Sequence, residues 1–376
     1  MKVLIVTNIY PSNEEPNRGV FVQNQVRALY QNGVDAAILL LDYRSLRHNR
    51  KIGFRVEKSD DMDVYILSFP ISPLHRIQYA LADVVTCYAY RRVTKSFGRP
   101  DIIHGHFLEG SYGIKKIKRM YKLPCIVTEH GSNVFLFNRT RVETRYMNNL
   151  YNKIDRVIFV GHEQQANACD LQLKNSLVIP NVVPKYFEYK ELCNRDDKYV
   201  FITVANLIQS KRIDVLIRAY NLVRASYPNS KLIIVGAGVK GQELKELVYE
   251  LGIEEAVEFK GTVKNIDLVD LYNASDCFVL PSIFETFGLV YAEALCCGLP
   301  VISANNGGIN EIADNSEYVK IVPKDDVNLL FEEMSNITKI EYDRKSISQK
   351  YCKKFSEKMF CEKIMSLYTE LTELQE

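Results

Sequence analysis

Two glutamates around the start of a predicted helix carry the most informative chemistry in this sequence. They lie in the segment 280–301, LPSIFETFGLVYAEALCCGLPV, where a predicted strand ends, a loop carries Glu285 and a helix begins near Phe287 or Gly288. The free backbone N–H groups at such a helix start form an anion site. Gly288 permits a phosphate to approach closely, and Glu293 could reach a ribose diol on the same ligand. Taken alone, the segment is explained equally well as a capped amphipathic helix with two solvated acids.

A G-x-G-x-x-G turn from Gly236 to Gly241 follows a predicted strand and opens a helix. This context matches a dinucleotide-binding fingerprint, and Glu258 lies where a ribose-binding acid would be sought. However, the turn follows the second strand of its domain rather than the first, and Glu258 lies inside a strand. We therefore interpret the glycines as a tight turn that is also compatible with close approach to a ligand phosphate, and we keep a dinucleotide-dependent oxidoreductase as an alternative.

Residues that could ligate a metal do not form a credible set. Asp61-Met62-Asp63 has the D-x-D spacing of metal-dependent transferases, but it lies between two predicted hairpin strands, which is typical of a solvated turn. His104 and His106 end a predicted strand, and because the spacing places no third ligand beside them, we interpret them as an ordinary strand-end pair. The sequence therefore predicts no metal site.

These groups need a scaffold that brings strand ends together, and the hydrophobic pattern predicts one. Short apolar runs rich in Val and Ile alternate with segments of helical period, as in parallel sheets covered by helices on both faces. In the first half, we expect strands at 2–6, 36–41, 101–104, 125–128, 156–160 and 176–179, a hairpin at 52–68, and helices at 20–31, 74–97, 110–121, 143–152 and 162–173. In the second half, we expect strands at 199–204, 231–235, 257–259, 277–280, 301–303 and 319–322, with one or two amphipathic helices over 341–374. The predicted fold class is α/β, with two doubly wound domains.

Composition and charge agree with a two-domain globular protein. The chain has 376 residues, of which 47% are hydrophobic and 25% charged, and this excludes collagen-like, disulfide-framework and largely disordered classes. Its nine Cys include no C-x-x-C pair, which indicates reduced thiols. The apolar opening Met1–Val6 is far shorter than a membrane span, and no targeting signal is visible. Residues 1–190 carry a net charge of +10 and residues 191–376 carry −8, so the first half is a candidate for an anionic partner.

A boundary between the two domains is predicted where Pro180-Asn181-Val182-Val183-Pro184 is followed by the polar run 190–198. We expect an N-terminal Rossmann-like domain at 1–188 and a C-terminal one at 189–356. The final helix, 357–376, is expected to return and pack on the first domain.

The segment with Glu285 and Glu293 resembles the E-x7-E signature of retaining nucleotide-sugar glycosyltransferases of family 4, which have the GT-B architecture of two facing Rossmann-like domains. The resemblance covers nearly the whole chain, is strongest over 199–312 and is weak over 44–100. Other segments resemble the family in order and spacing: Asn17-Arg18-Gly19-Val20, Thr128-Glu129-His130-Gly131-Ser132, Val178-Ile179-Pro180-Asn181, Val204-Ala205-Asn206-Leu207 with Lys211, and Gly261-Thr262-Val263.

The resemblance implies a role for each matching residue. Glu285 would orient donor hydroxyls, Glu293 would hold the ribose and His130 would lie against the sugar. The leaving diphosphate would be stabilised by Lys211 and by the helix start. The implied donor-binding set is Gly19, Asn206, Lys211, Gly236, Val263, Phe287, Gly288, Leu289 and Glu293, and the implied catalytic set is Glu285, His130 and Lys211.

Two positions depart from the family pattern. Asn206 stands where the family usually has an arginine, so one expected cation is missing from the diphosphate site. Asn181 is followed by Val182 where the family usually has Gly, which we interpret as hinge variation.

The expected function is transfer of a hexose-type sugar from a nucleotide sugar, with a UDP-sugar as the expected donor, to a hydroxyl of a glycan or lipid-linked glycan with retention of configuration. No cofactor, metal or nucleic acid is expected. The expected location is cytoplasmic. Basic stretches at 88–95 and 115–122 suggest peripheral contact with an anionic membrane face, against the plainer interpretation of solvated helix faces. A sugar-nucleotide-binding partner that does not catalyse transfer remains a second alternative.

Overall fold

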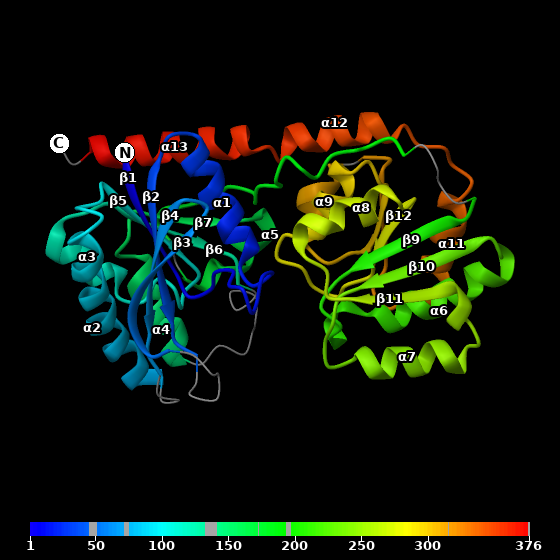
Figure 1. Ribbon diagram of the computed structural model, residues 1–376, viewed down its shortest axis with the longest axis horizontal. Helices are drawn as coiled ribbons and strands as arrows, with labels where there is room; N and C mark the ends of the chain where they lie inside the picture. Colours follow the sequence, from blue (N-terminus) through cyan, green and yellow to red (C-terminus); the bar gives the residue numbers. More distant parts are fainter. Residues whose placement is uncertain are drawn as a thin grey trace. The chain divides into compact units, whose positions relative to one another are not determined.

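The computed structural model has two compact units (Figure 1). Unit 1 comprises Met1–Val182 and Glu357–Glu376, and unit 2 comprises Val183–Ser356. The units divide after Val182, where the backbone N–H of Val183 donates to the carbonyl of Phe355 within unit 2. The domain boundary expected from sequence stays a prediction. The structure describes residues 1–44, 51–70, 75–131, 141–171, 173–192, 197–314 and 316–374, apart from the side chains of 75–80 and 170.

Unit 1 is built on an eight-stranded sheet in the order β3-β4-β2-β1-β5-β6-β7-β8. Its pairs are parallel except for β3–β4, which form the hairpin predicted at 52–68. The central strand β1 is apolar on both faces, since Val3, Leu4, Ile5 and Val6 are all fully buried. The strands are β1 (Lys2–Thr7), β2 (Asp35–Asp42), β3 (Gly53–Ser59), β4 (Met62–Ser68), β5 (Ile102–His106), β6 (Cys125–Glu129), β7 (Arg156–Phe159) and β8 (Ser176–Val178).

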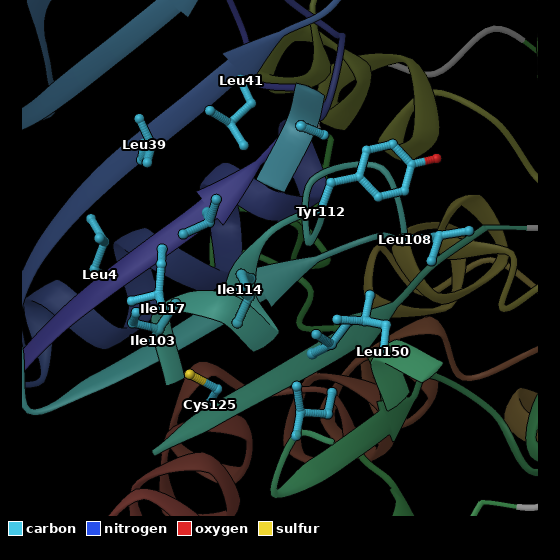
Figure 2. Close-up of a cluster of buried hydrophobic side chains, with 14 of the residues drawn as sticks. Leu4, Leu39, Leu41, Ile103, Leu108, Tyr112, Ile114, Ile117, Cys125 and Leu150 are labelled. Carbon is cyan, nitrogen blue, oxygen red and sulfur yellow. The ribbon is translucent and has the colours of Figure 1, made fainter. Parts of the chain in front are cut away.

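Helices cover both faces of this sheet. Leu4 and Leu39 point to one face, where they join Ile114, Ile117 and Leu150 in one hydrophobic cluster (Figure 2). That face is covered by α2 (His75–Thr94), α3 (Ile114–Tyr121) and α4 (Arg141–Tyr151). The opposite face is covered by α1 (Val20–Gln31) and by α13 (Glu357–Glu373), and a short helix α5 (His162–Asn167) follows β7.

Unit 2 has a fully parallel sheet of six strands in the order β11-β10-β9-β12-β13-β14. This is the doubly wound order 3-2-1-4-5-6, in which the strand order reverses between the first and fourth strands. The strands are β9 (Tyr199–Val204), β10 (Ser230–Val235), β11 (Val257–Gly261), β12 (Cys277–Leu280), β13 (Val301–Ala304) and β14 (Val319–Val322). The helices are α6 (Ile213–Ser226), α7 (Gly241–Glu250), α8 (Leu268–Asn273), α9 (Leu289–Cys296), α10 (Gly308–Ala313), α11 (Val327–Ile337) and α12 (Arg344–Lys354).

The predicted strands are confirmed, and the differences lie at helix ends. The helix expected at 110–121 begins only at Ile114, because Gly113 adopts a left-handed conformation with φ 82°. The helix expected at 162–173 ends at Asn167, and the tail divides into α12 and α13. Position 74, where a helix was expected to begin, lies outside the described residues, as does Ser132. Within the described ranges, no helix has the length and hydropathy to cross a membrane.

Candidate functional site

The topological switch point of unit 2 brings Lys211 and Glu285 together. Lys211 ends a short 3-10 turn after β9, and Glu285 lies in the loop between β12 and α9, so both follow the carboxyl ends of adjacent strands. The Lys211 Nζ lies 2.6 Å from the Glu285 Oε1, and the two side chains are only 19% and 12% exposed. The Ile283 N–H donates to the carbonyl of Ser210 (2.8 Å) and fastens the two loops to each other. Two residues expected to meet the phosphate and the sugar therefore form a partly buried ion pair.

A third loop, which follows β13, holds the backbone of Glu285. The Glu285 N–H donates to the carbonyl of Asn306 (3.1 Å), and the Gly308 N–H donates to the carbonyl of Glu285 (3.1 Å). A Cβ on Gly308 would lie 2.8 Å from the Glu285 Cβ and from the Phe287 backbone, so only glycine fits this close approach. The position of the carboxylate is consequently set by three loops.

The buried hydroxyl of Tyr291 connects the end of β12 with the end of β13 and the loop that follows it. This hydroxyl donates to the carbonyl of Leu280 (2.9 Å) and accepts hydrogen bonds from the Ser303 hydroxyl (2.9 Å) and the Asn306 amide (2.8 Å). Burial raises the pKa of Tyr291 well above its usual value, so it stays a neutral donor. Sequence reasoning missed Tyr291, Asn306 and Gly308. A signal was available, because Asn306-Gly307-Gly308 follows a predicted strand end as the Glu285 loop does.

The start of α9 lies beside Glu285, as predicted. The helix begins at Leu289, and Gly288 before it has φ 78°, a left-handed conformation that favours glycine. A Cβ on Gly288 would lie 2.4 Å from the Tyr291 ring, which is a second reason for glycine here. Phe287 is buried and packs edge-on against Phe355. The first N–H groups of α9 thus belong to a firmly held helix end that can accept an anion.

Glu293 is buried inside α9 next to the loop that contains Val263. Its carboxylate accepts hydrogen bonds from the Asn265 amide (3.2 Å) and the Tyr272 hydroxyl (3.4 Å). Burial raises the pKa of Glu293 to about 7, and these two donors only partly oppose the shift. The Asn265 Oδ1 in turn accepts from the Tyr186 hydroxyl (2.5 Å). The expected ribose contact and the expected base loop are therefore connected through Asn265, which sequence reasoning did not single out.

The glycine turn after β10 packs against the loop that carries Asn206. A Cβ on Gly236 would lie 1.9 Å from the Ala205 carbonyl oxygen, and one on Gly238 would lie 2.4 Å from that of Leu207. The backbone N–H of Leu207 donates to the carbonyl of Ala237 (3.0 Å), so the two loops are joined along their backbones. The glycines are thus explained by packing, and the Asn206 side chain is exposed beside them.

Glu258 does not occupy the position of a free ribose-binding acid. It forms ion pairs with Lys231 (2.7 Å) and with Lys260. Hydrogen bonds from these lysines lower the pKa of Glu258. These contacts remove the support that Glu258 lent to the oxidoreductase alternative.

His130 and Gly19 belong to unit 1 and lie near each other there. Gly19 caps α1 with φ 74°, and Phe21 in the first turn packs against the His130 ring with centroids 4.8 Å apart. The His130 Nε2 lies 3.0 Å from the His106 Nδ1, and the two rings stack. Burial lowers the pKa of His106 to about 3 and that of His130 well below its usual value, so both rings are neutral.

His104 continues this buried histidine cluster. Its Nδ1 lies 2.6 Å from the Tyr368 hydroxyl of α13, and its Nε2 lies 2.7 Å from the Thr128 hydroxyl. Its ring stacks on His106 with centroids 4.5 Å apart. The two histidines predicted as an ordinary strand-end pair therefore take part in a network that reaches His130, which only the neighbouring strand β6 and helix α13 could reveal.

The predicted turn includes Asp61 of the D-x-D sequence, whereas Met62 and Asp63 already belong to β4. Asp60 and Asp61 have φ values of 49° and 65° between β3 and β4, and Asp63 pairs with Lys58 (2.8 Å). Across the part of the chain that the structure describes, no group of three or more His, Cys, Asp or Glu side chains could hold a metal ion.

Comparisons with known proteins agree over most of the chain. The family model described as Glycosyltransferase Family 4 matches residues 19–185, and that described as Glycosyl transferases group 1 matches residues 187–358. A Bacillus subtilis glycosyltransferase that is assigned to teichuronic acid biosynthesis is 26% identical over 346 residues, which are 86% of each chain.

Solved structures share the fold. Sucrose-phosphate synthase from Thermosynechococcus elongatus has a TM-score of 0.77 at 18% identity, over 98% of each chain. The Anabaena protein HepE in complex with UDP-glucose has a TM-score of 0.75 at 18% identity, over 99% of this chain and 100% of that one. Two doubly wound units, the two family models and these neighbours agree, and the chain therefore belongs to the family 4 glycosyltransferases with the GT-B fold.

Proposed function

We propose that this glycosyltransferase moves a hexose-type sugar from a nucleotide sugar, with a UDP-sugar as the first candidate, to a hydroxyl of a glycan or lipid-linked glycan and retains the anomeric configuration. The observation that carries the proposal is the Lys211–Glu285 ion pair at the switch point, directly before the start of α9. A cation and a free helix N-terminus attract a diphosphate, and the adjacent carboxylate can accept hydrogen bonds from sugar hydroxyls. UDP-glucose bound to the structural neighbour HepE supports the choice of donor.

The chemical demand on the site is to stabilise the leaving diphosphate. When the bond between the anomeric carbon and the phosphate oxygen breaks, its electron pair and the negative charge move to that oxygen. The ammonium of Lys211 and the N–H groups around Leu289 would meet this charge in the transition state. The acceptor oxygen would attack from the same face and pass its proton to the leaving phosphate. In this scheme no protein nucleophile is required.

The other residues would hold and orient the donor. Glu293 would receive the ribose hydroxyls, and the loop with Val263 and Asn265 would face the base, because this loop and Glu293 are already hydrogen-bonded. Glu285 would orient sugar hydroxyls through the oxygen that Lys211 does not hold. His130, neutral and backed by His106, would lie against the sugar.

A ligand screen followed by turnover assays tests this proposal. Thermal stabilisation by UDP-, GDP- and ADP-sugars should identify one base, and donor consumption should then survive EDTA. Product NMR should show that the donor configuration is kept, and inversion would refute the mechanism. Loss of activity with EDTA and recovery with Mn²⁺ would indicate a metal-dependent reaction, with Asp61 and Asp63 as the candidate ligands. Donor binding without turnover under any acceptor would favour the non-catalytic alternative, and quenching of nicotinamide fluorescence would favour the oxidoreductase.

A matched pair of variants tests the assigned roles. Glu293→Ala should weaken nucleotide binding, since its carboxylate is assigned to the ribose. Glu285→Ala should leave free-nucleotide binding nearly intact and reduce turnover, since its carboxylate is assigned to the sugar. Equal loss of free-nucleotide affinity in both variants would contradict the assignment.

A further inference from the structure

A cationic groove runs over the outer surface of unit 1, on the face that α2, α3 and α4 cover. It has a volume of about 640 Å³. Among the described residues, seven line it, of which six are basic and one is acidic: Asp83 from α2, Lys115, Lys116, Lys118 and Arg119 from α3, Lys122 after α3, and Lys153 after α4.

Most of the positive charge in this cationic groove is not neutralised. Lys118 pairs with Asp155 (2.5 Å). Among the described residues, no carboxylate lies within ion-pair distance of the other basic side chains of the groove. Burial raises the pKa of Asp83, and the charges of Lys115, Lys116 and Arg119 oppose this shift. Like charges held together in this way attract anions.

The fold holds these cations in place. Ile114 and Ile117 point into the hydrophobic core (Figure 2), so the opposite face of α3 must present its basic residues outward. The Lys115 ammonium lies 4.2 Å from the centre of the Tyr146 ring of α4. The Arg91 Nε donates to the Tyr121 hydroxyl (3.1 Å) and connects α2 with α3. The cationic groove is therefore built on three packed helices rather than on a loose tail.

An apolar ridge lies on α2, the helix that contributes Asp83 to the groove. Leu81, Val84 and Tyr88 follow one another at helical spacing and are 37%, 58% and 50% exposed. A single exposed apolar side chain needs no explanation, but three on one helix face beside a cationic groove form an amphipathic surface. Helices of this kind bind at the interface of anionic bilayers.

We propose that this surface docks on an anionic bilayer, with lipid phosphate groups in the cationic groove and the ridge of Leu81, Val84 and Tyr88 entering the interface. Lipid phosphates match the unpaired cations, and the ridge gives a bilayer an advantage over a soluble phosphate compound. The proposal does not depend on the reaction that the enzyme catalyses, because none of these residues belongs to the donor site proposed above.

Vesicle sedimentation of the full chain tests the proposal. The probe is vesicles of 30% phosphatidylglycerol and 70% phosphatidylcholine at 50 mM salt. Lys116→Gln, Arg119→Gln and Lys122→Gln together should weaken binding about a hundredfold, at about fivefold for each cation. The matched control replaces Lys345, Lys353 and Lys363, three exposed lysines outside the groove, with Gln and removes the same charge. This control should bind nearly as the wild type does.

Further measurements distinguish binding in the cationic groove from non-specific electrostatic attraction. Binding should fall steeply as salt rises to 300 mM. Val84→Ser with Tyr88→Ser should weaken the binding that survives at high salt. Circular dichroism melts and donor binding should be unchanged in all variants. Equal loss in the groove and control triples, equal binding to pure phosphatidylcholine, or full competition by 10 mM inorganic phosphate would each overturn the proposal.

Discussion

Removing the Lys211 ammonium should damage both stability and turnover, and the two losses can be separated. In Lys211→Met the side chain keeps much of its length but loses the charge that lies 2.6 Å from Glu285. Breaking a buried ion pair costs about 3–5 kcal/mol, whereas exposed pairs contribute about 0–1 kcal/mol. With side chains 19% and 12% exposed, this pair lies between those limits, so we expect the free energy of unfolding to fall by about 1–3 kcal/mol.

The loss of turnover has a different origin. A charge-assisted contact to a transition-state phosphate contributes about 2–4 kcal/mol, which is about thirty-fold to a thousand-fold in rate. We expect a loss of turnover near the upper limit of this range, because Asn206 supplies no charge. Arg212 cannot replace Lys211, since its guanidinium donates to both Asp214 oxygens (3.1 Å each) and to Asp325.

Urea unfolding without ligand and initial rates with donor measure the two effects. The double variant Lys211→Met/Glu285→Gln should be less destabilised than the sum of the single variants, because it leaves no unpaired charge. Lys231→Met is the matched control, since it breaks a pair with Glu258 (2.7 Å) at the amino end of β10 and should leave turnover unchanged. Near-normal turnover in folded Lys211→Met would refute the reasoning, and the turn from Gly236 to Gly241 would then be the next place to seek the phosphate site.

Three further predictions concern single residues. Nucleotide-sugar affinity should rise with pH through about 7, because the raised pKa keeps Glu293 neutral below that pH. The same shift should lower the stability of the ligand-free protein as pH rises from about 4.5 to about 7. Glu293→Gln should reduce both pH dependences, which calorimetry and thermal melts measure. Asn206→Arg should tighten binding of the free nucleoside diphosphate in titrations, and kcat should rise only if the pyrophosphate is weakly held in the wild type. His106→Phe should lower turnover and reduce the free energy of unfolding in urea by about 1–3 kcal/mol, because the buried His130 Nε2 loses its partner at 3.0 Å. His104→Phe should leave the His106–His130 contact in place and should therefore lower turnover less than His106→Phe does.

The strands and the start of α9 could be predicted because their signals are local. Apolar runs such as Val3 to Val6 are buried on both faces of a parallel sheet, so their composition alone identifies them. Gly288 and the glutamates around it lie within one strand–loop–helix segment, so their order in the chain already places the helix start. The helix expected at 110–121 began late because Gly113 takes a left-handed conformation, which no periodicity reveals.

Order along the chain thus determined the two α/β domains, the helix start and the candidate residues that we propose bind a donor. Which of these residues meet was decided by tertiary structure. Lys211 and Glu285 are separated by 74 positions and touch only because β9 and β12 are neighbours in the sheet. His104 lies 264 positions from Tyr368 and meets it only because α13 packs on the N-terminal sheet. The pKa of Glu293 follows from its burial in the packed unit, where Asn265 and Tyr272 donate to its carboxylate from 28 and 21 positions away. Ion pairs, buried hydrogen bonds and desolvation depend on distances that only the packed chain sets, which is the physical reason for this division.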